Sequence, residues 1–234
     1  MSQKDIDNEA FARMAQKWLG LPVDGWAGQN THLAFRAKTG AAAPTPPIAH
    51  ALTKPSAFFA TVKASFGPLS QTQVDGFNAL LSAMKSWPLQ WAAYGLATAW
   101  HETATKMQPI HEFGGNAYLS KYDTGSLAAA LGNTPAADGD GQIFAGRGYV
   151  QITGRRNYRA FGIEATPDDA LKPDVAARIM VDGMEKGVFT GKGLKSYPLG
   201  AYSDYRRIIN GQDQAAKIAD YASRFELALG AGGW

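Results

Sequence analysis

The chain has 234 residues, of which 45% are hydrophobic and 18% charged, a composition typical of one or two globular domains. The net charge of +3 is too small to predict nucleic acid as the main partner, because nucleic-acid-binding domains usually carry a dense basic face. The chain contains no cysteine, which excludes disulfides and thiolate metal sites.

The N-terminal segment is polar and lacks the apolar core of a secretory signal. The longest apolar stretch, Trp91–Trp100, has about half the length of the roughly 20 apolar residues that a membrane span needs. We therefore expect a protein that is made in the cytosol, has no export signal of its own and does not insert stably into a membrane.

Residues 1–42 are predicted to form a small helical module. Apolar residues from Ile6 to Trp18 recur at helical spacing, and Asp24 with Gly25 marks a turn. Thr31 is a suitable N-cap for a second helix. The prolines of residues 43–55 predict an extended linker, so this stretch is the predicted domain boundary.

Residues 56–234 form the second predicted domain, and their pattern is mainly helical. One short strand is expected, at Tyr149–Thr153. Three helical stripes carry the expected core: Val74, Phe77, Leu81 and Met84; a helix from Pro173 with Val175, Ile179, Met180 and Met184; and Ile218, Tyr221, Ala222, Phe225 and Leu229.

Glu102 is the first candidate for acid–base chemistry. It lies at the end of the apolar helix predicted from Trp91 onward. A carboxylate at the end of a buried helix is poorly solvated and retains its proton more readily, which is the state that a general acid needs. The alternative is a solvated helix-end carboxylate without a catalytic role.

Glu112 is the second candidate. On one continuous helix the carboxylates of Glu102 and Glu112 would be ~15 Å apart, at about 1.5 Å per residue. An inverting glycosidase needs its two carboxylates roughly 6.5–9.5 Å apart, with a water between them. Pro109 is expected to end the helix and let the chain turn back, which permits the shorter separation.

The His-Glu pairs at His101 and His111 also raise the possibility of a metal site. The spacing that places two histidines on one helical face is missing, and the chain has only 4 histidines. Histidines that orient or pack beside the carboxylates are the favoured interpretation. We expect neither a metal nor an organic cofactor.

Polar side chains suited to sugar binding follow Gly146. Gln151 and Thr153 lie on one face of the expected strand, and Asn157 comes shortly after; together they offer hydrogen-bond donors and acceptors. Arg147 belongs to a basic cluster in the same segment. It is either a solvated surface charge or a contact for carboxylates of an acidic polymer.

Several ordered motifs resemble glycoside hydrolase family 19. Residues from about 58 to 229 are similar to the bacteriophage endolysin branch of that family. The resemblance implies a mainly α, lysozyme-like and chitinase-like catalytic domain with a short strand element. It rests on these segments: Ala99–Thr103, Gln108–Gly115, Leu131–Asn133, Gly146–Tyr158 and Ile208–Gly211.

The resemblance also implies roles for individual residues. Glu102 takes the place of the general acid, and Glu112 is the candidate general base. Plant chitinases of the family carry the base after a longer aromatic loop, which this chain lacks, and they are disulfide-bonded. The resemblance implies that four residues bind substrate: Gln151, Thr153, Asn157 and Asn210. Arg147 and Tyr118 are two further candidate substrate-binding residues.

The segment Trp18–Thr31 resembles the LGLxVDGxxGxxT signature of helical peptidoglycan-binding modules. Asp24, Gly25, Trp26 and Thr31 are its candidate wall-binding residues. The alternative is a helical hairpin that merely packs on the enzyme, since Asp-Gly turns are common in loops.

Taken together, the resemblances imply a phage endolysin that hydrolyses the β-1,4 bond between N-acetylmuramic acid and N-acetylglucosamine in bacterial peptidoglycan. We expect it to be a monomer. Such an enzyme would be made in the host cytoplasm and would reach the periplasm after holin-dependent release. Three alternatives stay open: a chitinase, a lytic transglycosylase, and a non-catalytic wall-binding protein.

Overall fold

The computed structural model describes residues 13–20 and 52–234, and the chain divides into two compact units, Met1–Pro47 and Ile48–Trp234. In the first unit, residues 13–19 are helical, within the stretch where the apolar spacing predicts a helix. The rest of the predicted wall-binding module lies outside the described residues, as does most of the predicted linker. This includes the candidates Asp24, Gly25, Trp26 and Thr31.

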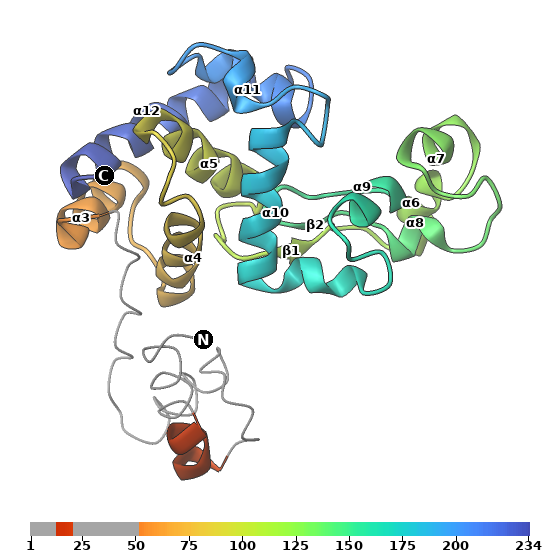
Figure 1. The fold of residues 1–234 in the computed structure, drawn as a ribbon, viewed down its shortest axis with the longest axis horizontal. Helices are drawn as coiled ribbons and strands as arrows, with labels where there is room; N and C mark the ends of the chain where they lie inside the picture. Colours follow the sequence, from red (N-terminus) through yellow and green to blue (C-terminus); the bar gives the residue numbers. More distant parts are fainter. Residues whose placement is uncertain (1–12, 21–51) are drawn as a thin grey trace. The chain divides into compact units, whose positions relative to one another are not determined.

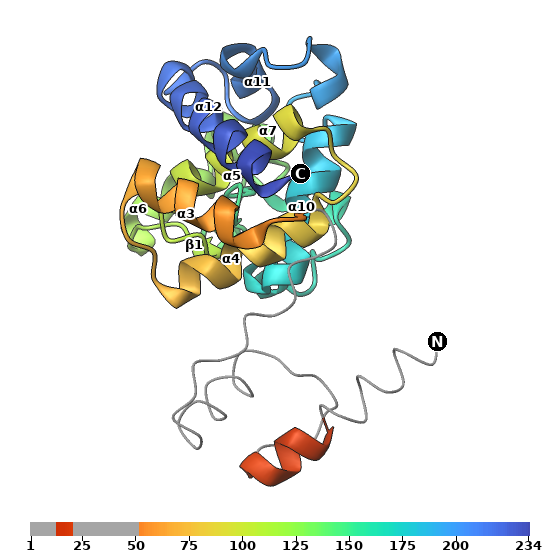
Figure 2. The same cartoon turned by 90° about the vertical axis from the view of Figure 1, so that its left-hand side faces the viewer.

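The second unit is mainly helical, as expected (Figure 1). α12 packs against both α5 and α3, and α10 packs against α4; Figure 2 shows α3 and α12 side by side. In Figure 1, α10 lies between this group of helices and a lobe of short elements. The long helices are α3 (Pro55–Phe66), α4 (Gln71–Ala83), α5 (Leu89–Glu102), α10 (Pro173–Lys186), α11 (Tyr202–Ile209) and α12 (Ala215–Gly232).

The lobe of short elements contains two strands that pair antiparallel, β1 (Ile110–His111) and β2 (Arg147–Gly148). None of the helices that the structure describes combines the length and the apolar character needed to cross a bilayer. The remaining short elements are α6 (Asn116–Leu119), η1 (Ser120–Tyr122), α7 (Gly125–Leu131), α8 (Asp140–Ile143), α9 (Arg155–Ala160), η2 (Pro167–Leu171) and η3 (Leu194–Ser196).

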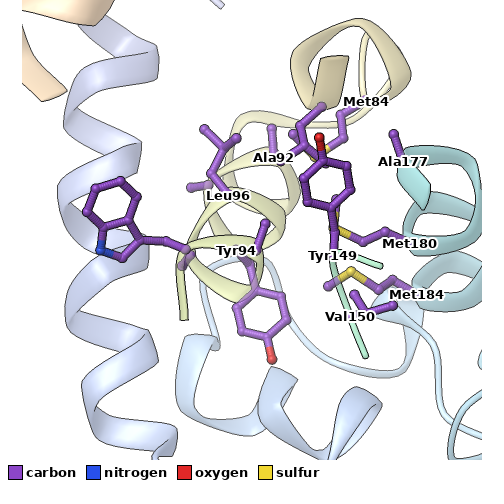
Figure 3. Packing of buried hydrophobic residues seen from close by; sticks show 14 of the residues in the cluster. Met84, Ala92, Tyr94, Leu96, Tyr149, Val150, Ala177, Met180 and Met184 are labelled. Atoms are coloured by element: carbon purple, nitrogen blue, oxygen red, sulfur yellow. The ribbon is translucent and has the colours of Figure 1, made fainter. Parts of the chain in front are cut away.

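Helix α5 forms the centre of the core, because its residues 92–100 are all buried. A helix that is buried all round is expected only where neighbours cover every face. Gly95 allows one such close approach, since a Cβ atom there would lie 2.6 Å from Sδ of Met84. Figure 3 shows Tyr149 beside Met180 of α10, in the space next to α5. This packing fixes the position of the α5 C-terminus, where Glu102 lies.

The helical stripes predicted from the sequence are confirmed in their main members. α10 begins at Pro173, and a proline at the first helical position loses no hydrogen bond. Val74, Val175 and Tyr221 are only partly buried. The buried members are Phe77, Leu81, Met84, Ile179, Met180, Met184, Ile218, Ala222, Phe225 and Leu229.

The predicted strand Tyr149–Thr153 is wrong. The strand is Arg147–Gly148, and residues 149–151 form a turn that a single bridge between Arg147 and Ile152 closes. Gln151 has a φ of 51°, which is left-handed backbone incompatible with a strand. Tyr149 is fully buried in the core, so its apolar character reflects burial and not strand alternation.

The expectation that Pro109 ends the helix that carries Glu102 is also wrong, because α5 already ends at Glu102. Thr103 holds the turn that follows: its hydroxyl donates to the carbonyl oxygen of Ala99 at 2.7 Å and accepts from the amide of Met107 at 3.0 Å. The chain therefore leaves the helix before Pro109. In the turn that follows Glu102, three residues have positive φ values: Ala104 (47°), Thr105 (66°) and Met107 (52°).

An ion-pair network stabilises the short-element lobe. Arg155 pairs with the buried Asp140 and, at 3.0 Å, with Glu164. Arg159 pairs with the other oxygen of Glu164 at 2.7 Å. The hydrogen bonds from Arg159 and Arg155 lower the pKa of Glu164 from 4.5 to about 2. Two arginines of the basic cluster therefore have partners within the protein.

This network predicts a pH-dependent effect of Glu164→Gln. A carboxylate whose folded pKa is depressed stabilises the fold fully above its unfolded value of 4.5, and the contribution is lost as pH falls toward 2. The variant should have a slightly lower Tm than the wild type at pH 7, and the difference should shrink steadily below pH 4.5 in thermal denaturation. A Tm difference that stays constant across this range would contradict the assignment.

Candidate active site

A cleft of about 560 Å³ opens where the C-terminus of α5 meets the lobe of short elements. Its walls come from α5, from the loops around β1 and β2, and from the end of α11. Seven of the residues that the sequence predicts for the site line this one cleft: Glu102, Glu112, Tyr118, Gln151, Thr153, Asn157 and Asn210.

In contrast to the expectation from the sequence, Glu102 has an ion-pair partner at the end of its helix. Its Oε1 accepts a hydrogen bond of 2.6 Å from Nη1 of Arg206 on α11. The side chain of Arg206 is 3% exposed and that of Glu102 is 17% exposed, so the ion pair is largely shielded from water. Within the described residues, Oε2 of Glu102 accepts no hydrogen bond and is left for a ligand.

Arg206 is the most important residue that the sequence analysis did not single out. Its Nε donates to the carbonyl oxygen of Asp213 at 2.9 Å, which holds the guanidinium beside Glu102. Arg206 and Glu102 are 104 positions apart in the chain, so no local spacing connects them. Only the packing of α11 and α5 in one core brings them together.

Glu112 is held by two hydrogen-bond donors. Its Oε1 accepts from the hydroxyl of Tyr122 at 2.9 Å, and its Oε2 accepts from the amide of Gly146 at 3.0 Å. Both donors point at the carboxylate, an arrangement that suits an anion. A Cβ atom at Gly146 would lie 3.0 Å from Oε2 of Glu112, so glycine permits this close approach.

Tyr122 is a second residue that the sequence analysis missed. Burial raises its pKa to about 12, and the hydrogen bond to Glu112 acts in the same direction. The hydroxyl therefore keeps its proton at neutral pH and donates a hydrogen bond to Glu112. Tyr122 lies in η1, ten positions after Glu112, and no periodicity in that short helix indicates its role.

The three polar residues predicted for sugar binding do meet in the cleft, although a turn and not a strand brings them there. Gln151 donates from Nε2 to the carbonyl oxygens of Ile110 and Gly148, at 2.9 and 3.0 Å. Asn157 donates from Nδ2 to the carbonyl oxygen of Thr153 at 2.9 Å. These bonds orient both amides and leave their carbonyl oxygens as acceptors within the described structure.

Arg147 does not reach the cleft, so the structure corrects its predicted role in substrate binding. Its side chain is 7% exposed, and its Nε pairs with Asp168 at 2.9 Å. The guanidinium is used inside the fold, where it holds the segment before β2 against α9. Nη1 donates to three further oxygens: the carbonyl oxygens of Ile143 and Ala145 and the hydroxyl of Tyr158.

His101 lies beside the Glu102–Arg206 pair. Burial lowers its pKa below 6.5, and the charge of Arg206 acts in the same direction while that of Glu102 opposes it. His101 is therefore neutral at pH 7. No group of three His, Cys, Asp or Glu side chains in residues 13–20 and 52–234 is placed to hold a metal ion.

Comparison with known proteins adds no further assignment. No protein-family model matches the chain, and no solved structure matches it. The functional interpretation therefore depends on the geometry of the cleft and on the sequence motifs.

Proposed function

We propose that this protein is an endolysin that hydrolyses the β-1,4 bond between N-acetylmuramic acid and N-acetylglucosamine in peptidoglycan. One observation carries the proposal: Glu102 and Glu112, which the sequence places in a family 19-like motif pair, line the same cleft. An inverting glycosidase needs two carboxyl groups in one cleft, one as general acid and one as general base. The oriented amides of Gln151 and Asn157 in that cleft support a sugar ligand.

The proposed reaction starts from the protonated form of Glu102, which gives its proton to the bridging oxygen as the bond from that oxygen to the anomeric carbon breaks. Glu112 takes a proton from a water molecule, whose oxygen forms the new bond to the anomeric carbon from the opposite face. The anomeric configuration inverts. Proton donation leaves a carboxylate on Glu102, and the nearby guanidinium of Arg206 stabilises that charge.

The biological setting follows from the same proposal. The enzyme would be made in the host cytoplasm, would reach the wall after holin-dependent release, and would act as a monomer without a cofactor. The module proposed for residues 1–42 would raise the local concentration of the enzyme on peptidoglycan. That contribution increases encounter with the substrate and adds no chemistry.

Product analysis of digested walls tests the proposed function. We expect soluble fragments with new reducing ends, detected by mass spectrometry, and much weaker release from colloidal chitin. Fragments that end in anhydro-muramic acid would instead identify a lytic transglycosylase. Faster release from chitin would identify a chitinase, and the absence of products from both polymers would leave a wall-binding protein.

A further inference from the structure

Two exposed aromatic residues at the cleft each lie next to a lysine. The side chains of Phe113 and Tyr118, 67% and 50% exposed, line the cleft. Nζ of Lys106 is 4.9 Å from the ring centroid of Phe113, and Nζ of Lys121 is 3.4 Å from that of Tyr118. We refer to these four residues as the lysine rim. Each ring holds an ammonium group at the edge of the cleft.

The lysine rim is connected to the candidate base. Lys121 also lies 4.5 Å from the ring centroid of Tyr122, whose hydroxyl donates to Glu112. The ring of Tyr118 packs tightly on the backbone at Gly114, where any Cβ atom would collide with it. These contacts place the rim on the Glu112 side of the cleft and hold the ring of Tyr118 against the backbone.

The two lysines carry charges that nothing in the described part of the chain neutralises. Neither Lys106 nor Lys121 has a carboxylate within ion-pair distance among residues 13–20 and 52–234. In contrast, Arg147, Arg155 and Arg159 all pair with carboxylates inside the fold. Positive charge is therefore available to a ligand at the rim and not at these arginines.

We propose that the lysine rim recognises carboxylates carried by the muramyl residues of the substrate strand. This inference rests on the proposed function and adds a specificity element to it. Peptidoglycan carries carboxylates on its peptide stems, and on the lactyl group wherever the stem has been removed, whereas chitin is uncharged. The ammonium groups that lie over the two rings at the edge of the cleft pair with carboxylates that project from the strand.

The test compares the full-length wild type with the double variant Lys106→Gln and Lys121→Gln. Both side chains are exposed, so the variant should fold normally. Initial rates are measured on three soluble preparations of the same glycan strands: intact strands, strands freed of peptide that keep the lactyl carboxylate, and intact strands whose carboxylates are converted to neutral amides. Lys85→Gln serves as the control, because Lys85 is exposed and, unlike Lys106 and Lys121, lies over neither of the two aromatic rings that line the cleft.

The double variant should have about a tenfold higher KM on intact strands, with kcat within about twofold, as expected for two exposed charge contacts. Its KM on the amidated strands should equal that of the wild type, and the double variant Lys106→Arg and Lys121→Arg should restore wild-type kinetics. A KM increase on intact strands alone would identify peptide carboxylates as the ligand; an increase on peptide-free strands as well would show that the rim also accepts the lactyl carboxylate, which is free only where the peptide has been removed.

Two outcomes would overturn the inference while the proposed function stands. In the first, the double variant cleaves intact strands with wild-type KM. In the second, its KM rises equally on amidated strands, which would assign the lysines a role in shaping the cleft. If the wild type cleaves no strand at all, the proposed function fails and this inference fails with it.

Discussion

Replacing Glu102 by Gln should reduce kcat on peptidoglycan strands by roughly 10²–10⁴-fold, the range that a general acid contributes. Glutamine keeps the size of the side chain and still accepts the hydrogen bond from Arg206, but it has no acidic proton to give. KM should change little, because the proton is transferred only as the bond breaks. Single-turnover rates on soluble strands measure this effect.

Folding has to be measured in the same variant, because the substitution leaves Arg206 buried beside a neutral partner. We expect Glu102→Gln to lower the free energy of unfolding by about 3–5 kcal/mol, as for a buried charge that loses its counter-charge. Thermal denaturation checks this value. The fold should survive, so the loss of kcat at temperatures well below Tm reflects chemistry.

Asp220→Asn is the matched control for Glu102→Gln. Asp220 also pairs with an arginine, at 2.9 Å, but the pair lies on the exposed surface of α12. The kcat of Asp220→Asn should stay within about twofold of the wild-type value, as for surface substitutions in general. A substrate with a nitrophenolate leaving group adds a second check, because that leaving group departs without being protonated. On this substrate, the difference in kcat between Glu102→Gln and the wild type should be smaller. A deficit of equal size on both substrates would contradict the role of general acid.

Local sequence pattern accounts for the helices that carry the site. The apolar run before Glu102 predicts a buried helix, and burial of residues 92–100 follows from it. Pro173 marks the start of α10 because proline is favoured at that position. The motif residues Gln151 and Asn157 were predicted to bind together, and they do line one cleft. These features depend on short-range spacing, which a single sequence contains.

Other features of the site depend on long-range packing and could not be predicted in this way. The turn after Glu102 uses positive φ values at Thr105 and Met107, residues without a local preference for that conformation. The side chain of Met107 is fully buried in the core, and its amide donates to the hydroxyl of Thr103. Arg206 reaches Glu102 only because two helices that are distant in sequence pack together. Arg147 is buried against partners such as Tyr158, which the basic residues around it in the sequence do not indicate.

Replacing Glu112 by Gln should also reduce kcat by roughly 10²–10⁴-fold, because water then has no base to take its proton. Glutamine has a single acceptor oxygen, so one of the two donors, the amide of Gly146 or the hydroxyl of Tyr122, loses its acceptor, and we expect a lower Tm than that of the wild type. Tyr122→Phe removes one donor and leaves the carboxylate in place. It should reduce kcat only about tenfold, as for one hydrogen bond to a charged group.

Glu112→Ala separates a general base from a structural carboxylate. Removing the side chain opens space beside the anomeric carbon, and azide, which needs no deprotonation, should restore turnover and yield a glycosyl azide of inverted configuration. Glu102→Gln should not respond to azide, because its missing step is proton donation. If Glu112→Gln keeps most of its activity while Glu102→Gln loses it, one carboxylate suffices for bond cleavage. The products should then carry anhydro ends, since a transglycosylase needs no base to activate water.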